Sequence, residues 1–212
     1  MSRLKQWRNG SWQDVDFNQW RNGRWVKVEV NQWRNGKWEK ISTQKFTNTW
    51  EATWSQTYRE SGTKRTDYRA NRLCQGEYLS DPWGLMRSLC GFNDSSIRSK
   101  LSGADINDVK LYLHNEHWYY YAGGKAVVGG HNHSNEPSRF SHSKYSIKQQ
   151  SYSKRHQAKW IDMPNWFGTG LRDGKYRGFS LYSAYNNMRY YGIFFGAGSG
   201  WRSPKIKISY EK

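Results

Sequence analysis

The sequence predicts an all-β protein in which an N-terminal antiparallel β-meander of three Asn-Gly hairpins is followed by a jelly-roll-like β-sandwich. Two observations lead to this prediction. The first forty-five residues repeat one Trp-rich phrase three times, and the rest of the chain alternates short strand-like segments with Gly-, Asn- and Ser-rich turns. We therefore divide the chain into a meander domain, residues 1–45, and a sandwich domain, residues 46–212.

The repeated phrase is Gln-Trp-Arg-Asn-Gly-x-Trp, and its copies begin at Gln6, Gln19 and Gln32. Each copy centres on Asn-Gly, which favours a two-residue type I′ turn because both residues tolerate positive φ. Such a turn fixes the register, so that the two Trp residues of each copy lie opposite each other one step beyond the turn. The predicted pairs are Trp7 with Trp12, Trp20 with Trp25, and Trp33 with Trp38.

The thirteen-residue period of the repeat equals an eleven-residue strand plus a two-residue turn, which predicts long strands at residues 11–21 and 24–34. This register also places Trp12 opposite Trp33. It sets Asp16 against Glu29, however, and a like-charge pair costs stability. A set of separate hairpins contributed by several subunits is the alternative arrangement.

The six Trp residues of the repeats are assigned to anchoring or assembly. Cross-strand aromatic pairs contribute on the order of 0.5–1.5 kcal/mol each beyond the area they bury. Both faces of the meander carry apolar side chains, so one face must pack on another surface. We expect that surface to belong to the rest of the chain, to a sister subunit or to a larger assembly, and we expect a homo-oligomer, with a trimer as one option. A ligand-docking role for the Trp residues is the alternative.

The second domain is predicted to be built mostly of strands, because apolar and polar residues alternate in many short segments. These segments are 46–58, 75–78, 83–92, 109–114, 126–128, 179–182, 188–195 and 205–210. Two short helices are also expected. One follows Asn93, whose side chain can cap its N-terminus, and is closed by Gly103, and the other covers residues 166–172.

The composition is strongly basic, with 34 Lys and Arg against 17 Asp and Glu and a formal net charge of +17. Such a surface attracts polyanions such as nucleic acid, teichoic-acid-like polymers or an acidic protein shell, although basicity can also serve solubility alone. No apolar run approaches the roughly 20 residues that a bilayer span needs. The N-terminus has no apolar stretch typical of a secretory signal. We therefore expect a soluble cytoplasmic product without membrane insertion, with Cys74 and Cys90 as buried thiols.

Several blocks of the second domain, in order, resemble a domain found in tail and minor-tail proteins of phages that infect Gram-positive bacteria. The blocks are Ile97–Gly103, Val109–Leu113, His131–Ser134, Trp160–Pro164 with Phe167–Gly178, and Tyr191–Phe194 before Ile206–Tyr210. The resemblance covers roughly residues 50–212 and rests on the order and spacing of these blocks. It implies a non-enzymatic virion module at the periphery of a tail, in a position to touch the cell surface.

Motifs for catalysis or metal binding are weak. His131 and His133 could together hold a divalent ion, but their spacing is not a tight metal signature and a polar role at the end of a strand is favoured. The acidic residues show no arrangement that indicates a general acid and base pair. The chain also lacks a phosphate-binding loop and a nucleophile elbow. We expect no catalytic residue, no metal and no cofactor.

Aromatic residues are the better candidates for ligand binding. Four successive aromatics at residues 118–121 must point to both faces of a strand, so some of them should reach solvent or a partner. An exposed ring beside Asn, Arg or His can stack on a sugar ring. Filling a thin core is the alternative role for these rings. The candidate ligand-binding residues are Trp118, Tyr119, Tyr120, Tyr121, His131, His133, Arg189 and Tyr190.

These observations lead to a functional hypothesis. The chain is expected to be a structural protein of a phage virion, located on the tail or particle surface and made in the host cytoplasm. It would contact other virion proteins and contribute to adsorption on host cell-wall glycan or teichoic polymer. The alternatives are a capsid decoration or head fibre protein without a glycan ligand, and a nucleic-acid-binding protein. Nucleic acid is the less expected partner, because the basic residues are distributed throughout the chain and share strands with acidic residues.

Overall fold

The structure is a computed structural model that describes residues 5–15, 17–40, 44–67, 71–78, 82–185 and 187–212. Within these ranges, nothing is described for the side chains of Lys5, Trp12, Asp14, Arg34, Glu39 and Lys40. The chain divides into two compact units. Residues Met1–Phe46 and Glu211–Lys212 form the hairpin unit, and Thr47–Tyr210 form the sandwich unit.

The hairpin unit contains three two-stranded antiparallel sheets among its described residues. Their strands are β1 (Lys5–Arg8) with β2 (Ser11–Asp14), β3 (Asn18–Arg21) with β4 (Arg24–Lys27), and β5 (Asn31–Arg34) with β6 (Lys37–Lys40). Each Asn-Gly turn has positive φ at both residues, for example 48° at Asn9 and 76° at Gly10, as a type I′ turn requires. The predicted Trp partners are confirmed in all three registers.

The prediction that long strands at residues 11–21 and 24–34 join these hairpins is wrong. In the part of the chain that is described, each strand is only four residues long and pairs within its own hairpin. Trp12 and Trp33 are therefore not cross-strand partners. Pairing in the second hairpin ends where the Val28 N–H donates to the Phe17 carbonyl oxygen at 2.9 Å. One step further, the same register would set Glu29 against Asp16, which lies outside the described residues, and this like-charge pair opposes any extension.

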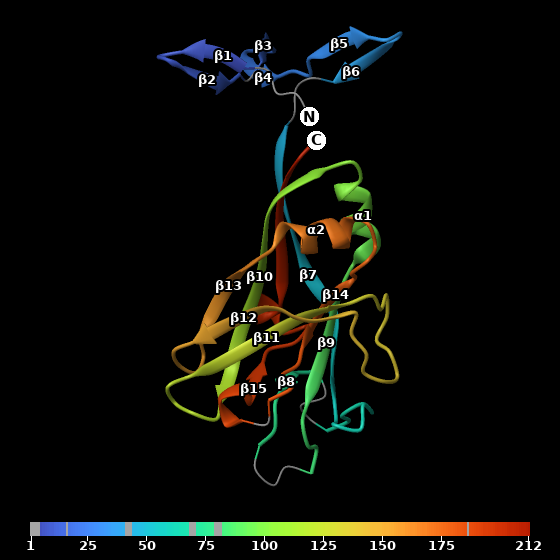
Figure 1. Ribbon diagram of the computed structural model, residues 1–212, viewed down its shortest axis with the longest axis vertical. Coiled ribbons are helices and arrows are strands. Elements are labelled where there is room, and N and C mark those ends of the chain that lie inside the picture. Colours follow the sequence, from blue (N-terminus) through green and yellow to red (C-terminus); the bar gives the residue numbers. More distant parts are fainter. Residues whose placement is uncertain (1–4, 16, 41–43, 68–70, 79–81, 186) are drawn as a thin grey trace. The chain divides into compact units, whose positions relative to one another are not determined.

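The sandwich unit is built from one folded path of antiparallel strands, which the described residues show in the order β12-β11-β14-β9-β7-β16-β10-β15-β8, with β13 also paired to β10 (Figure 1). Strands β9 and β14 contact β8 across the fold, β11 contacts β15, and β12 contacts β13. The path therefore folds into two facing layers, which confirms the predicted all-β sandwich. The bounds are β7 (Lys45–Tyr58), β8 (Leu73–Gln75), β9 (Arg87–Phe92), β10 (Asp105–Trp118), β11 (Gly124–His131), β12 (Lys144–Tyr152), β13 (Ala158–Met163), β14 (Gly178–Leu181), β15 (Gly192–Phe194) and β16 (Lys205–Glu211).

Both predicted helices are present, as α1 (Asp94–Leu101) and α2 (Asn165–Arg172). The Asn93 side chain accepts a hydrogen bond from the Ser96 N–H at 3.0 Å and caps α1. The two helices contact each other, and α2 packs on β10 (Figure 1). Two 3₁₀ turns, η1 (Met188–Tyr190) and η2 (Gly200–Arg202), complete the unit. None of the helices in the described ranges has the length and apolar character needed to cross a membrane.

A bulge in β10 decides which of its side chains enter the core. Before the bulge the inward positions are odd, with Val109, Leu111 and Leu113 fully buried. The pairing of β10 with β15 then shifts register between Asn115 and His117, and a bulge of this kind moves the following side chains to the other face. The even-numbered Trp118 consequently points inward and is fully buried.

Trp118 lies at the centre of an aromatic cluster between the two layers. Its ring centroid is 5.4 Å from that of Phe194 in an edge-to-face arrangement and 5.6 Å from that of Tyr152. Gly124 and Gly192 lie against the same ring, where an added Cβ would overlap it. The core also contains both cysteines as buried free thiols, as predicted.

We predict that Trp118→Ala lowers the free energy of unfolding by about 3–5 kcal/mol, because the change removes a fully buried ring and leaves a cavity between the layers. Urea denaturation followed by circular dichroism measures this loss. The matched control is Trp166→Ala on α2, whose side chain is 48% exposed and whose loss should stay near or below about 1 kcal/mol. Equal losses in the two variants would contradict the assignment of Trp118 as the centre of the core.

Candidate functional site

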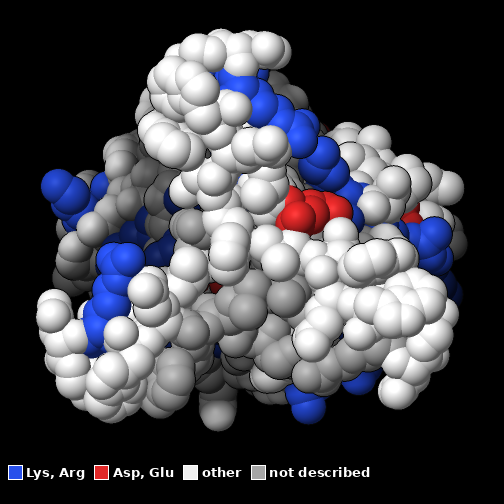
Figure 2. Space-filling view, turned by 90° about the horizontal axis from the view of Figure 1, so that it is seen from above, with Lys and Arg blue, Asp and Glu red and all other residues white. Residues whose placement is uncertain are grey.

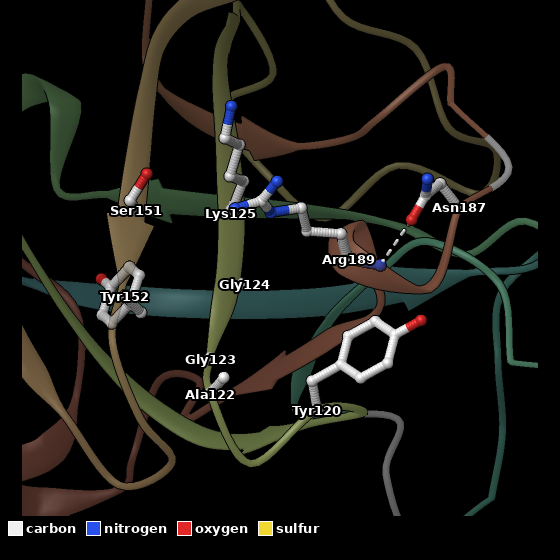
Figure 3. Close-up of a pocket in the computed structure, with 9 residues that line it drawn as sticks. All are labelled: Tyr120, Ala122, Gly123, Gly124, Lys125, Ser151, Tyr152, Asn187 and Arg189. Atoms are coloured by element: carbon white, nitrogen blue, oxygen red, sulfur yellow. Dashed lines mark hydrogen bonds between the residues drawn. The ribbon is translucent and has the colours of Figure 1, made fainter.

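The sandwich unit contains a pocket with a volume of ≈ 350 Å³ next to the start of β11. Strands β11 and β12, the turn before β11 and the 3₁₀ turn η1 form its walls (Figure 3). The lining residues are Tyr120, Ala122, Gly123, Gly124, Lys125, Ser151, Tyr152, Asn187 and Arg189. Two residues predicted to bind ligand, Tyr120 and Arg189, therefore lie in the same pocket, although they are far apart in the sequence.

The turn before β11 requires its two glycines. Gly123 has a φ of 90°, and a Cβ at this position would overlap the carbonyl oxygen of Tyr152. β11 then pairs with β12 so that Gly124 faces Tyr152 and Lys125 faces Ser151. The close approach of the two backbones fixes one wall and places the Lys125 side chain at the pocket.

The opposite wall is η1, whose N-terminus is capped by Asn187. The Asn187 Oδ1 accepts a hydrogen bond from the Arg189 N–H at 2.9 Å, and the Asn187 carbonyl oxygen accepts one from the Tyr190 N–H at 2.8 Å. Figure 3 shows the Arg189 side chain extending from η1 toward β11. The Tyr190 ring stacks on Tyr185 with a centroid distance of 5.2 Å, which supports η1 from outside the pocket.

Gln75 on β8 joins the two walls through its fully buried side chain. Its Nε2 donates to the carbonyl oxygens of Lys125, at 2.9 Å, and Tyr190, at 2.8 Å. Its Oε1 accepts from the Val127 N–H at 2.7 Å. One amide therefore sets the separation between β11 and η1, and Gln75 is a positioning residue for the pocket.

The lining of the pocket is basic and carries no acidic side chain. Lys125 and Arg189 supply two positive charges, Asn187 and Ser151 supply neutral polar groups, and the Tyr120 ring is 48% exposed. A guanidinium group can bind a phosphate or carboxylate through two parallel hydrogen bonds, and a partly exposed ring can stack on a sugar. This combination suits a small acidic saccharide or a sugar phosphate.

The aromatic run at residues 118–121 is divided between the core and the surface. Trp118 cannot contact a ligand, because the bulge in β10 buries it completely, so its assignment to ligand binding is corrected. Tyr119 packs between Tyr78 and Tyr120, with centroid distances of 5.6 and 4.9 Å. Tyr121 is 81% exposed, and its ring centroid lies 4.1 Å from the Arg155 guanidinium carbon. Only Tyr120 of this run lines the pocket.

His131 and His133 are held by backbone and hydroxyl groups away from the pocket. The buried His131 Nε2–H donates to the Cys90 carbonyl oxygen at 2.9 Å, and its Nδ1 accepts from the His133 N–H at 3.1 Å. The His133 Nε2 lies 2.9 Å from the Ser141 hydroxyl. Both nitrogens of His131 are therefore engaged, which corrects its assignment to ligand binding. No group of three or more His, Cys, Asp and Glu side chains within the described ranges could hold a metal ion.

The repeat Trp residues of the hairpin unit are exposed where their side chains are described. The rings pair edge to face at 5.3 Å in the second and third hairpins. Exposed Arg21, Arg24 and Lys37 flank the turns, and Figure 2 shows Lys and Arg side chains spread over the face that it draws. The exposed fractions are 57% for Trp7, 56% for Trp20, 69% for Trp25, 55% for Trp33 and 70% for Trp38, while the Trp12 side chain lies outside the description.

The sequence analysis missed three polar residues of the pocket lining, Lys125, Ser151 and Asn187, and the positioning residue Gln75 behind it. Two of them carried a local signal. Lys125 directly follows Gly123-Gly124, a turn that ends an aromatic run, and Asn187 stands two residues before Arg189, where an Asn can cap a short helix. Gln75 and Ser151 carried none, because their roles depend on strands that are distant in the sequence.

No protein-family model matches the chain, and no curated protein is significantly similar to it. The functional assignment therefore depends on the chemistry of the surface and of the pocket.

We predict that Gln75→Leu lowers the free energy of unfolding by roughly 3 kcal/mol or more, because two carbonyl groups and one N–H lose their partner in a buried site. Urea denaturation measures the effect. Gln149→Leu on β12 is the control, since its side chain is exposed and its change should stay within about 0.5 kcal/mol. If Gln75→Leu unfolds with wild-type stability, the amide does not hold the pocket walls.

The buried His131 predicts a loss of stability in acid. Burial lowers its pKa from 6.5 to about 4, so between these values the unfolded chain binds a proton that the folded chain does not. Stability is therefore full above pH 6.5 and falls as the pH decreases toward 4, by about 2 kcal/mol between pH 7 and pH 5. Urea denaturation of the wild type and His131→Gln at both pH values measures this difference. An equal loss of stability in the two proteins would show that the loss does not come from His131.

Proposed function

We propose that the protein is a non-enzymatic component of a phage virion, on or near the tail, that helps the particle adsorb to a Gram-positive host by binding an acidic wall glycan or teichoic-type polymer. The observation that carries the proposal is the pocket at the start of β11, which combines two cations, an exposed Tyr ring and no acidic side chain. The resemblance of residues 50–212 to phage tail modules supports the virion setting.

The pocket residues have complementary roles in this proposal. Arg189 binds a phosphate or carboxylate of the polymer through its planar guanidinium, and Lys125 adds a second, more flexible charge. Tyr120 stacks on an adjoining sugar ring, and Ser151 and Asn187 hydrogen-bond to its hydroxyl groups. Such a site binds one short segment of a polymer, so its intrinsic affinity is modest.

Assembly supplies the remaining affinity. The exposed Trp pairs of the hairpin unit are suited to contacts with other virion proteins or with sister subunits. A homo-oligomer, such as a trimer, presents several pockets to the same wall. Linked weak sites then bind with an avidity that exceeds the single-site affinity by orders of magnitude.

We predict that the labelled protein is retained on purified Gram-positive cell walls and that this retention requires the wall polymer. Arg189→Gln should lower retention about tenfold, because a charge-assisted hydrogen bond is lost, and Tyr120→Ala should also lower it. Arg98→Gln, an equal charge change at an exposed position of α1, is the control and should bind like the wild type.

The same retention is measured on walls from which the polymer has been removed, and at two salt concentrations. Retention that persists from about 0.1 M to about 1 M NaCl, where the Debye length falls from roughly 10 to 3 Å, indicates short-range binding in the pocket. Retention that is abolished by salt and is equal in all variants would refute the pocket. If the protein binds no wall, the adsorption role is refuted, and the alternative of a decoration protein without a glycan ligand is favoured.

A further inference from the structure

A second surface of the sandwich unit combines exposed rings with positive charge, on the outer face of the layer that contains β13, β10 and β16. Before the bulge, the even-numbered residues of β10 point outward, and Tyr112 lies beside its cross-strand partner Trp160 with ring centroids 5.2 Å apart. Two residues further along β10, the His114 ring lies 5.1 Å from both Trp201 and Phe195. We call these five residues the aromatic strip.

The aromatic strip presents flat rings to solvent at two points. Trp160 is 40% exposed and Trp201 is 69% exposed. Their supporting partners on β10, Tyr112 and His114, are separated by two residues of extended chain, or roughly 6.6 Å. Burial and the nearby Arg202 lower the pKa of His114, which favours the neutral form of the ring that packs against Trp201. The strip thus offers two platforms held by one rigid strand.

One cation accompanies each platform. The Lys207 ammonium lies 4.5 Å from the Trp160 ring centroid. The Arg202 guanidinium carbon lies 4.2 Å from the Phe195 centroid and 5.8 Å from that of Trp201. A cation at this distance is attracted to the ring face, which holds the charge beside a surface on which a sugar can stack.

The charges along the strip do not cancel. Three acidic side chains beside it are paired: Lys110 binds Asp162 at 2.9 Å, Arg72 binds Glu116 at 2.7 Å and Lys205 lies 3.5 Å from Glu51. Lys207 and Arg202 have no acidic partner in the described part of the chain. Two positive charges therefore remain, one beside each platform.

We propose that the aromatic strip is a second carbohydrate-binding site, which takes an extended glycan chain with widely spaced acidic groups. Trp160 and Trp201 stack on sugar rings, and Lys207 and Arg202 bind the acidic substituents. The strip shares no residue with the lining of the pocket, and the proposal does not depend on a virion role.

Single-stranded nucleic acid fits the strip less well than such a glycan. It also offers stacking faces, but it carries one phosphate per nucleotide. Asp162, Glu116 and Glu51 already hold Lys110, Arg72 and Lys205, so among the described residues of the strip only Lys207 and Arg202 remain to meet phosphates that follow one another at every nucleotide. For a hydroxyl-rich chain the same carboxylates are useful, because they accept hydrogen bonds from sugar hydroxyls.

The test measures binding of the full chain to carboxymethyl dextran, to unsubstituted dextran and to oligo(dT) by affinity gel electrophoresis. Trp160→Ala and Trp201→Ala should each weaken binding to carboxymethyl dextran about fivefold or more, through the loss of one stacking platform. Lys207→Gln should weaken binding to carboxymethyl dextran and leave binding to unsubstituted dextran unchanged. Unchanged thermal melting of each variant establishes that its fold is intact.

Matched controls separate this site from the pocket. Trp166→Ala removes an exposed Trp from α2 and Lys100→Gln removes an exposed charge from α1, and both should retain wild-type binding to carboxymethyl dextran. Because the pocket can itself take an acidic saccharide, the strip variants are also measured in the Tyr120→Ala background, where they should weaken binding by the same factor. The proposal is overturned if the wild type binds neither dextran, if the strip variants bind like the controls, or if only oligo(dT) is retained.

Discussion

The bulge in β10 is the constraint on which the sandwich unit depends. A strand with strict alternation would place Trp118 on the same outer face as Tyr112 and His114. The register shift between Asn115 and His117 reverses this alternation, and the buried Asn115 side chain holds it by donating to the carbonyl oxygens of His117, at 2.8 Å, and Ile193, at 2.9 Å. The largest ring of the core is thereby directed between the layers.

The two faces of β10 have different roles. On the inner face, Trp118 packs with Phe194 and Tyr152, and the space around its ring is closed by glycines rather than by larger side chains. On the outer face, Tyr112 and His114 support the exposed Trp160 and Trp201. A single strand therefore links the stability of the core to the geometry of the surface that we propose as a carbohydrate site.

The pocket depends on a different kind of constraint. Its two cations come from β11 and η1, which are held at a fixed separation by the buried Gln75 amide. A loop-borne Arg at the surface would lose much side-chain and backbone freedom on binding a ligand. Anchoring η1 through Asn187, Tyr185 and Gln75 reduces this cost, since the backbone that carries Arg189 is already ordered.

The sequence by itself determined the local features: three Asn-Gly turns and their Trp registers, the Asn93-capped helix, the alternating strands and the excess of positive charge. Each of these follows from residues that are neighbours in the chain or directly opposite across a two-residue turn. It also pointed to Tyr120 and Arg189, but it could not bring them together or separate them from Trp118, His131 and His133. Those outcomes depend on the bulge in β10, on the Gln75 hydrogen bonds and on the contact of His131 with Cys90, and only the tertiary structure decided them. The same holds for the aromatic strip, because its rings and charges come from separate strands and turns that meet only when the two layers form.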